Sequence, residues 1–328
     1  MKVLVTGAGG YIGSVLVPML LDAGHSVVAL DRFFFGKGRL PAGRKGLDIV
    51  EADIRTVGES IFAGVHSVID LAALSNDPLG ELNPEKTWAI NHLGRVRIAR
   101  LAKSRGAKRY VFPSSCSIYG FNDGVVDEKS GVNPLTTYAK ANQRAEADLL
   151  GLSGSGFCVT VMRQATVYGL SPRMRFDLAV NSMVHGFFRN GKIPISGDGR
   201  QWRPFIHVED TARALRMALE ADEGAVNGEI FNVGSNAQNY PIFGLGERVA
   251  KAIGVPFHYE LYGSADFRSY RVNFDKVRKT LGFSPKHDVG DGAAEIWKAL
   301  REGKLDADDP QAITLDWYKR LIARGAEI

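Results

Sequence analysis

The chain has 328 residues and a formal net charge of +5, and 45% of its residues are hydrophobic while 23% are charged. This length exceeds the size at which one hydrophobic core stops growing, so we expect one large domain or two unequal domains. No apolar run approaches the roughly 18 residues that span a bilayer, and the scattered basic residues follow no recognition-helix pattern, so we predict no membrane and no nucleic acid as partner.

The chain begins with MKVLVTGAGG, a strand-like run without the basic and apolar regions of a signal peptide, which predicts a cytoplasmic protein. The two cysteines, Cys116 and Cys158, are too few for a disulfide framework in a chain of this length. The seven histidines include no pair with the helical i, i+4 spacing of metal ligands. We therefore expect no metal site.

Short apolar runs alternate with segments of helical length along most of the chain. Strands are predicted at residues 3–6, 26–30, 49–52, 67–73, 109–112, 159–162 and 230–233, and helices at 11–23, 84–104 and 137–150. Continuous apolar strands that alternate with helices are typical of a parallel sheet covered on both faces. The expected fold is α/β, a Rossmann-type doubly wound parallel sheet with a smaller α+β substrate-binding lobe.

The domain boundaries follow from where this alternation becomes irregular. After residue 168 the chain is rich in Gly, Pro and Arg, and the segment around 207–234 resembles a helix and a strand that return to the sheet. We therefore predict one domain from residues 1–168 plus 203–240. A second lobe is predicted from residues 169–202 plus 241–328.

The first predicted turn, TGAGGYIG, lies between a strand and a helix and contains Gly7, Gly10, Tyr11, Ile12 and Gly13. The three glycines permit a tight turn, close approach of the backbone to a pyrophosphate, and close packing of the helix on the strand. The unpaired N–H groups at the start of the helix then face the phosphates. The loop therefore predicts that the first domain binds a dinucleotide.

Acidic residues end the second and third predicted strands. Asp31 follows Gly13 by eighteen residues, where its carboxylate can accept hydrogen bonds from the adenosine ribose. This carboxylate would repel a 2′-phosphate, which favours NAD, whereas the neighbouring Arg32 could pair with that phosphate and keeps NADP open as the alternative. Asp53, followed by Ile54, is placed to meet the adenine, although Asp53 could instead cap a helix.

These motifs together resemble the extended short-chain dehydrogenase/reductase family, the nucleotide-sugar epimerases, dehydratases and reductases. The resemblance rests on TGAGGYIG, DLAAL, PSSCSIYG, the helix that begins near Tyr138, RQATVYG and GDGRQWRPFIHVED, and covers nearly the whole chain. It implies NAD on the first domain and a nucleotide-diphosphate sugar on the second lobe. Leu71, Ala72 and Ala73 would then lie against the cofactor, although plain core residues would look the same.

The family carries a Ser or Thr, a Tyr and a Lys as its catalytic set. The resemblance places the serine at Ser115 and the tyrosine at Tyr138, but the lysine position is occupied by Asn142. None of the ten tyrosines is followed by a lysine four residues later. Residues four apart share a helix face, so Lys140 and Arg144 point elsewhere and cannot replace the missing lysine, which in the family holds the nicotinamide ribose and lowers the tyrosine pKa.

Two hypotheses follow from this substitution. An unperturbed tyrosine has a pKa near 10, so only about one in a thousand is phenolate at pH 7. In the first hypothesis Tyr138 still transfers a proton, its pKa lowered by oxidised nicotinamide or another cation, while Asn142 donates to the ribose. In the second, the chain holds cofactor and sugar nucleotide without turnover.

The residues before the YG at 119–120 bear on the reaction. In the family, 4,6-dehydratases carry an Asp-Glu pair there and decarboxylases a Glu, whereas this chain has Cys116 and Ser117. A 4-epimerase needs less, because Tyr138 takes the C4 hydroxyl proton while hydride passes to NAD⁺ and returns to the other face of the ketosugar. We therefore predict an NAD-dependent NDP-hexose 4-epimerase.

An alternative is an NAD(P)H-dependent nucleotide-4-ketosugar reductase, which uses the same groups once. Cys116 would add 3,5-epimerase activity if it matches the cysteine acid/base of the family's GDP-fucose synthase branch. The simpler reading of Cys116 is a small buried side chain.

A sugar diphosphate requires forked cationic donors. The resemblance places the diphosphate arginine at Arg203, and Arg268 offers a second, although either could form a surface salt bridge. Arg175 and Asn181 follow the predicted strand at 159–162 and are candidates for contact with the sugar or nucleotide.

Asn91, on the predicted helix at 84–104, has a family counterpart near the active site. As a polar residue among apolar neighbours it is expected either there, beside the cofactor, or at a partner interface. The family builds a four-helix-bundle dimer from the helices that correspond to 84–104 and 137–150, although these apolar residues could also simply cover the sheet. We expect a homodimer.

Overall fold

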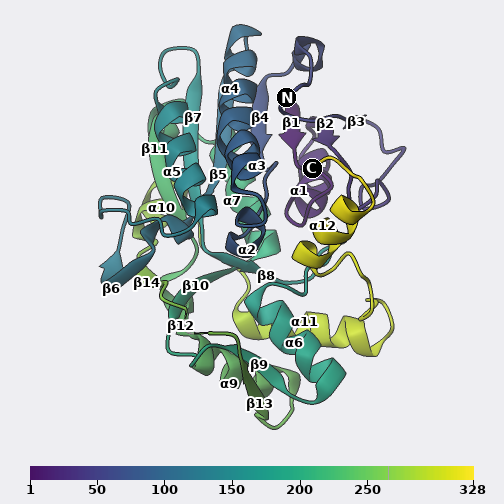
Figure 1. Cartoon of the computed structure of the whole chain (residues 1–328). Coiled ribbons are helices and arrows are strands. Elements are labelled where there is room, and N and C mark those ends of the chain that lie inside the picture. The colour runs from purple at the N-terminus through teal and green to yellow at the C-terminus, as the bar shows by residue number, and fades with distance from the viewer. Residues whose placement is uncertain (265) are drawn as a thin grey trace.

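A seven-stranded parallel sheet forms the centre of the computed structural model, which describes residues 1–264 and 266–328. Its strands are β1 (Lys2–Thr6), β2 (Ser26–Asp31), β3 (Leu47–Glu51), β4 (Ser67–Asp70), β5 (Arg109–Ser115), β7 (Cys158–Gln164) and β11 (Glu229–Val233). They lie in the order β11-β7-β5-β4-β1-β2-β3 (Figure 1). The strand order reverses between β1 and β4, and ligands of such sheets bind outside the carboxyl ends of the strands at that point.

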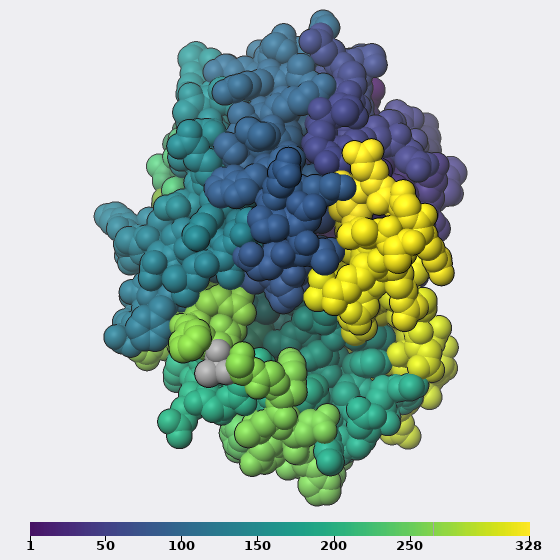
Figure 2. Space-filling view, in the orientation of Figure 1, coloured from purple at the N-terminus to yellow at the C-terminus, as the bar shows by residue number. Residues whose placement is uncertain are grey.

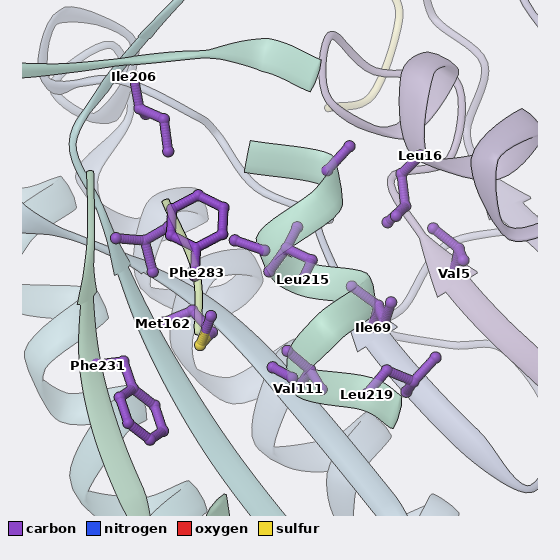
Figure 3. Close-up of a cluster of buried hydrophobic side chains, with 14 of the residues drawn as sticks. Val5, Leu16, Ile69, Val111, Met162, Ile206, Leu215, Leu219, Phe231 and Phe283 are labelled. Carbon is purple, nitrogen blue, oxygen red and sulfur yellow. The ribbon is translucent and has the colours of Figure 1, made fainter. Parts of the chain in front are cut away.

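Helices cover both faces of this sheet, which confirms the predicted doubly wound fold. The four long ones are α1 (Gly13–Asp22), α4 (Arg95–Ser104), α5 (Thr137–Leu150) and α7 (Val208–Glu220). Val3 and Val5 of β1 belong to a buried cluster with Leu16 of α1 and Leu215 of α7, part of which Figure 3 shows. Leu4 belongs to a cluster with α4 and α5 on the opposite face. Successive strand residues point to opposite faces, so a strand buried on both sides must be apolar throughout.

Smaller sheets and three helices form the lower part of the molecule in Figure 1. The strands are β8 (Thr166–Tyr168), β10 (Trp202–His207) and β12 (Asn239–Pro241) in one sheet, β9 (Ile193–Ser196) with β13 (Tyr259–Tyr262), and β6 (Phe121–Val126) with β14 (Ser269–Val272). The helices α6 (Ala179–Asn190), α9 (Ile242–Ile253) and α11 (Val289–Arg301) enclose a separate buried cluster. This part of the chain supplies the arginines expected to hold a diphosphate.

The last helix, α12 (Thr314–Ala323), crosses back to the first lobe. Trp317 donates a hydrogen bond from Nε1 to the carbonyl oxygen of Phe34 at 2.8 Å, and the Tyr318 ring meets Phe34 and Phe35 edge to face. The domain division predicted from the sequence assigned this helix to the second lobe. In Figure 2 the C-terminal segment, in yellow, lies beside the dark blue segment around α2 (Asp77–Gly80).

The helix predicted at 84–104 consists of three consecutive parts in the structure. These are α3 (Pro84–Trp88), the π-helical stretch η2 (Ala89–Gly94), and α4. A π turn holds more residues than an α turn, so it rotates the residues that follow it, and such turns are frequent at functional sites.

The remaining elements are short: α8 (Glu223–Val226), α10 (Asp275–Leu281), η1 (Glu59–Phe62), η3 (Cys116–Tyr119) and η4 (Asn236–Gln238). Among the described residues, none of the helices combines the length and the apolar character needed to cross a bilayer. The strand order described above leads us to expect ligands at the carboxyl ends of the central strands, on the side where the second lobe lies.

Candidate active site

A cavity of about 580 Å³ lies at the carboxyl ends of the central strands and is lined by residues of both lobes. It brings together most of the residues singled out from the sequence, which are Gly7, Gly10, Tyr11, Ile12, Gly13, Asp31, Arg32, Asp53, Ile54, Leu71, Ala72, Ala73, Ser115, Tyr138, Arg175, Arg203 and Arg268. Four residues of the prediction are not among its described lining residues: Asn91, Cys116, Asn142 and Asn181.

The glycine-rich loop leaves no room for side chains. Gly7 has a φ of +63°, and a Cβ built on it would lie 2.7 Å from the Ala72 backbone nitrogen. A Cβ on Gly13 would lie 2.4 Å from the Gly7 carbonyl oxygen. Backbone this close to the start of α1 forms the cradle that a pyrophosphate requires, because the first N–H groups of a helix are free to bind anions.

Asp31 ends β2 at the far side of this loop. Its carboxylate accepts hydrogen bonds from the backbone of Gly9 at 3.0 Å and of Phe33 at 2.7 Å. Burial raises the pKa of Asp31, and these two donors oppose the rise. The side chain is therefore fixed by its own loop, with its position at the cavity wall suited to a ribose hydroxyl.

Arg32 does not point a free charge into the cavity. Its guanidinium pairs with Asp53 at 2.9 Å and lies over the Phe34 ring at 4.7 Å. Asp53 pairs in addition with Arg55 at 2.6 Å, and although burial opposes it, these arginines lower the pKa of Asp53. Arg32 and Arg55 thus share one carboxylate, and it is the Asp31 carboxylate at the cavity wall that favours the unphosphorylated ribose of NAD over the 2′-phosphate of NADP.

Arg173 is a cavity residue that the sequence analysis missed. Only 3% of its surface is exposed, and its guanidinium lies over the Phe35 ring at 3.7 Å and donates to Thr314 at 3.0 Å. Burial lowers the pKa of Arg173, and its Nε has no hydrogen-bond partner among the described residues. A buried cation with an unused donor fits an anionic ligand such as a pyrophosphate.

Tyr138 and Ser115 face the cavity from neighbouring elements. Tyr138 lies in the first turn of α5, whose N-cap Thr136 accepts from the Ala139 backbone at 3.2 Å. Gly80 packs directly on it, because a Cβ there would lie 2.8 Å from the Tyr138 Cβ. Ser115 ends β5, and its hydroxyl accepts from the Ser117 backbone at 3.1 Å. The first turn of α5 thus holds Tyr138 in place, and the end of β5 holds Ser115.

Burial raises the pKa of the Tyr138 phenol, and its neighbours modify that rise. The Arg95 guanidinium, the Asn142 amide and the Ser115 hydroxyl lower the pKa, whereas the Asp77 carboxylate raises it. Arg95 is thus the positive charge that matters most to this phenol. The sequence analysis did not single it out, although it follows Asn91 by one helical turn and therefore shares the face that points at the sheet.

Asn142 lies behind the cavity wall, where 1% of its surface is exposed. Its Oδ1 accepts a hydrogen bond from the Arg95 guanidinium at 2.7 Å, while its Nδ2 has no partner among the described residues. Arg95 itself lines the cavity. The position where the family has a lysine therefore holds an amide that contacts a buried arginine of another helix.

Two of the predicted asparagines hold loops instead of reaching the cavity. Asn91 accepts from the backbone nitrogen of Leu74 and donates to its carbonyl oxygen, both at 2.9 Å. Asn181 accepts from the Gly169 backbone at 3.0 Å and donates to the Tyr11 hydroxyl at 3.1 Å. Both amides satisfy buried polar groups of the loops that carry cavity residues, so their effect on a ligand is indirect.

Cys116 lies in the core. Its thiol, 1% exposed, contacts the carbonyl oxygen of Arg163 at 3.3 Å, and burial raises its pKa. A thiol that is protonated and sits away from the cavity wall is unsuited to proton transfer with a sugar. The simpler reading of Cys116 as a small buried side chain therefore fits the structure, and the acid/base role does not.

Three arginines lie at the second-lobe side of the cavity, each paired with an aspartate. Arg203 pairs with Asp266 at 2.8 Å, and Arg268 pairs with Asp266 at 2.7 Å and contacts Asp77. Arg175 pairs with Asp177 at 2.6 Å, although burial works against its charge. Forked guanidinium donors at this position suit a diphosphate, which would have to compete with the aspartates.

Unused polar atoms concentrate around this cavity. Seven buried side-chain atoms lack a hydrogen-bond partner among the described residues. Four of them belong to residues that line the cavity: Ser117, Gln164, Arg173 and Gln201. Because an unsatisfied buried polar atom costs about 1–3 kcal/mol, this concentration indicates a surface built to receive a polar ligand.

A cluster of ligating side chains lies elsewhere. His207, Glu209 and His287 bring their ligand atoms within 4.8 Å of one another. Both ring nitrogens of His207 are already occupied, one by Glu295 at 2.7 Å and the other by the Glu209 backbone at 3.2 Å. The cluster therefore satisfies buried polar groups through hydrogen bonds, and we assign it no metal.

Comparison with known proteins places this cavity in a family. The model of the NAD-dependent epimerase/dehydratase family matches residues 3–234. A UDP-glucose 4-epimerase of Mycolicibacterium smegmatis is 29% identical over 317 residues, which are 92% of this chain and 99% of that protein. A dTDP-glucose 4,6-dehydratase of Streptomyces niveus is 27% identical over 326 residues, or 93% of this chain and 94% of that protein.

Solved structures extend the likeness to three dimensions. The structure of MoeE5 in complex with UDP-glucuronic acid and NAD is 28% identical in sequence and superposes with a TM-score of 0.82. The match covers 92% of this chain and 100% of that chain. The chain belongs to the NAD-dependent epimerase/dehydratase family, within the extended short-chain dehydrogenases/reductases. Its cofactor is NAD, as Asp31 and the glycine loop predicted.

Proposed function

We propose that the protein is an NAD-dependent nucleotide-sugar 4-epimerase that acts on an NDP-hexose. The observation that carries the proposal is that Tyr138 and Ser115 face the same cavity, while the two positions after Ser115 hold Cys116 and Ser117 and no carboxylate. The M. smegmatis relative is a UDP-glucose 4-epimerase, and MoeE5 binds UDP-glucuronic acid with NAD, which supports a nucleotide sugar as substrate.

The residues of this chain divide the work of that reaction. Tyr138 takes the proton of the C4 hydroxyl and later returns it, while the Ser115 hydroxyl steadies the same oxygen. Arg203 and Arg268 hold the diphosphate with forked donors once the sugar nucleotide displaces their aspartate partners. When bound, NAD supplies the hydride acceptor and donor at C4. The glycine loop and Asp31 hold its pyrophosphate and adenosine ribose.

Elimination of water needs an additional acid or base at a defined place next to Ser115, and in the free protein each described cavity aspartate already has a partner. The described lining residues include Asp31, Asp53, Asp77, Asp177 and Asp266. Four of these pair with arginines and Asp31 holds two backbone amides. None of the five is at position 116 or 117, next to Ser115, where the family's dehydratases and decarboxylases carry theirs. This favours the epimerase over those reactions.

The reductase remains the second candidate, since it uses the same groups once. The C-terminal segment covers the side of the cavity where we expect NAD, and this favours the epimerase. Tyr318 and Ile328 both line the cavity and are buried. An epimerase regenerates its cofactor in every cycle and gains from retaining it, whereas a reductase must exchange it each time.

The test is to incubate the purified protein with UDP, GDP, CDP and dTDP hexoses and follow the C4 configuration by NMR. We expect epimerisation without net NADH and about a thousandfold loss in Tyr138→Phe, because one positioned acid/base contributes about 10²–10⁴. Stoichiometric NAD(P)H oxidation by a 4-ketosugar without epimerisation would identify the reductase instead. Binding of NAD and sugar nucleotide without turnover by either route would leave a binding protein.

We also propose a homodimer through α5 and the helical segment 84–104. Leu93, in η2 beside α5, exposes 60% of its surface, which a partner helix would cover. Light scattering should give a dimer mass that Leu93→Asp lowers to a monomer. Leu261→Asp, at a comparably exposed leucine of β13, is the control and should leave the mass unchanged.

A further inference from the structure

We propose that Arg95 of α4 supplies the positive charge that a lysine at position 142 of α5 would supply. Asn142 holds the Arg95 guanidinium through a hydrogen bond. Arg95 is thereby a positioning and charge-supplying residue for Tyr138 and the adjoining end of the cavity. The turnover part of this inference rests on the proposed function, but its electrostatic part does not.

The guanidinium of Arg95 is fixed on three sides. Its Nε donates to the Ala72 carbonyl oxygen at 3.1 Å, another nitrogen donates to Asn142 Oδ1 at 2.7 Å, and its centre lies over the Phe112 ring at 4.8 Å. Only 2% of the residue is exposed, yet it lines the cavity that contains Tyr138. A cation held in this way stabilises a nearby anion without reorganising first.

A purely structural role explains this burial poorly. Burying an unpaired charge is costly, so buried arginines normally pair with carboxylates. Arg163 follows the rule, with Glu146 at 2.8 Å, whereas no carboxylate of the described residues forms an ion pair with Arg95. The buried Asp70 carboxylate acts, like Arg95, on the Tyr110 phenol, but it is bonded to the Tyr110 hydroxyl and forms no ion pair with Arg95. On the cavity side of Arg95, a Tyr138 phenolate is an anion that the chain itself can provide.

Asn142 is suited to the anchor position because its side chain is short and neutral. Its Oδ1 accepts a hydrogen bond from Arg95, and its Nδ2 has no other partner among the described residues. The amide can therefore donate to the Tyr138 oxygen, and it lowers the pKa of Tyr138. A lysine at 142 would instead bring a second buried cation against Arg95. The arginine and a lysine at 142 thus exclude each other, which explains why the YxxxK pattern is broken here.

Other charges face Tyr138 from the elements packed around it. Asp77 of α2 opposes phenolate formation, and Arg175, in the loop after β8, also interacts with the phenol. Asp77 contacts Arg268 and the hydroxyl of Thr136, while Arg175 pairs with Asp177. Their charges are balanced by these partners, so Arg95 is the cation without a carboxylate partner near Tyr138 within the described chain.

The direct test measures tyrosinate formation by ultraviolet difference absorbance against pH, with the Tyr138→Phe spectrum subtracted, in NAD-loaded and NAD-free protein. Arg95→Met should move the midpoint of Tyr138 upward by about one pH unit or more, because loss of a nearby opposite charge raises such a pKa by about 1–3. Arg95→Lys should restore most of the shift. Arg100→Met, on an exposed turn of the same helix, is the control and should leave the midpoint unchanged.

A second test moves the positive charge from Arg95 to position 142. Asn142→Lys alone should impair turnover and lower the melting temperature, since two cations then meet. Asn142→Lys combined with Arg95→Met should recover turnover and the tyrosinate midpoint relative to Arg95→Met. If Arg95→Met fails to fold, Asn142→Leu keeps the arginine but removes its anchor and should also raise the midpoint.

The inference is overturned if the Tyr138 midpoint is the same in wild type and in Arg95→Met, or if the double variant is no better than Arg95→Met. A wild type that epimerises no sugar nucleotide sinks the proposed function instead, while the tyrosinate titration still decides the role of Arg95.

Discussion

The two ends of the cavity are built in different ways. At the end where we expect the adenosine and pyrophosphate, the wall is a continuous stretch of backbone, from the tight turn at Gly7 to the start of α1, with Asp31 held by its own loop. At the Tyr138 end, side chains from β5, α4 and α5 converge. A backbone site tolerates no added volume, whereas a side-chain site tolerates exchange of residues if charge and geometry are kept.

The largest effect is expected at the backbone site. Gly13→Ala places a Cβ at 2.4 Å from the Gly7 carbonyl oxygen, and such overpacking costs about 1–3 kcal/mol, so NAD should bind roughly ten- to a hundredfold more weakly. Gly58→Ala, whose Cβ meets nothing within 4 Å, is the matched control by calorimetry. If Gly13→Ala bound NAD as tightly as the wild type, the loop would have moved to make room for the methyl group. The claim that this backbone site tolerates no added volume would then be wrong.

A smaller effect is expected from Arg173, the cation at the cofactor side. Arg173→Met should weaken NAD binding about tenfold, because a hydrogen bond to a charged group contributes about 1.5–3 kcal/mol. Arg189→Met, which loses an exposed ion pair with Asp308, should bind NAD as the wild type does. Unchanged affinity in Arg173→Met would mean that the backbone alone holds the pyrophosphate, which would sharpen the contrast between the two ends.

The smallest effect is a pH dependence that links the two ends. Burial raises the pKa of Tyr138 in the free protein, and the positive charge of NAD⁺ favours the phenolate, so binding lowers this pKa. Binding therefore releases a proton between the two pKa values, and affinity for NAD⁺ should increase a few-fold as the pH rises through that interval. The increase should be absent in Tyr138→Phe and for NADH, whose ring carries no charge.

Sequence patterns predicted NAD correctly because the pattern that indicates it is local. Gly7, Gly13 and Asp31 act through strand, turn and helix positions that a short window of sequence contains, and the family match agrees with the predicted NAD. Ser115 and Tyr138 were placed by the resemblance to the family, and in the structure they lie at a strand end and a helix start. Their chemical roles remain predictions.

The residues that sequence analysis missed are placed by tertiary contacts. Arg95 follows a π turn, and its partner Asn142 lies 47 residues further along the chain. Arg173 reaches the cofactor side under α12, a helix that the sequence placed with the other lobe. Asn91 was expected beside the cofactor or at a partner interface because it is polar among apolar neighbours, and Asn181 was a candidate for the sugar or nucleotide because it follows a predicted strand. Neither pattern distinguishes a ligand contact from a bond to buried backbone.

The return of α12 to the first lobe also has a kinetic meaning. If NAD binds at the glycine loop as proposed, we expect cofactor that leaves along this side to break first the Trp317 hydrogen bond to Phe34 and the contacts of Tyr318 with Phe34 and Phe35. The strength with which α12 is docked would then control how long one NAD molecule stays bound, independently of how tightly the pyrophosphate is held. Residence time and affinity could be changed separately in this protein, by mutating the helix for one and the glycine loop for the other.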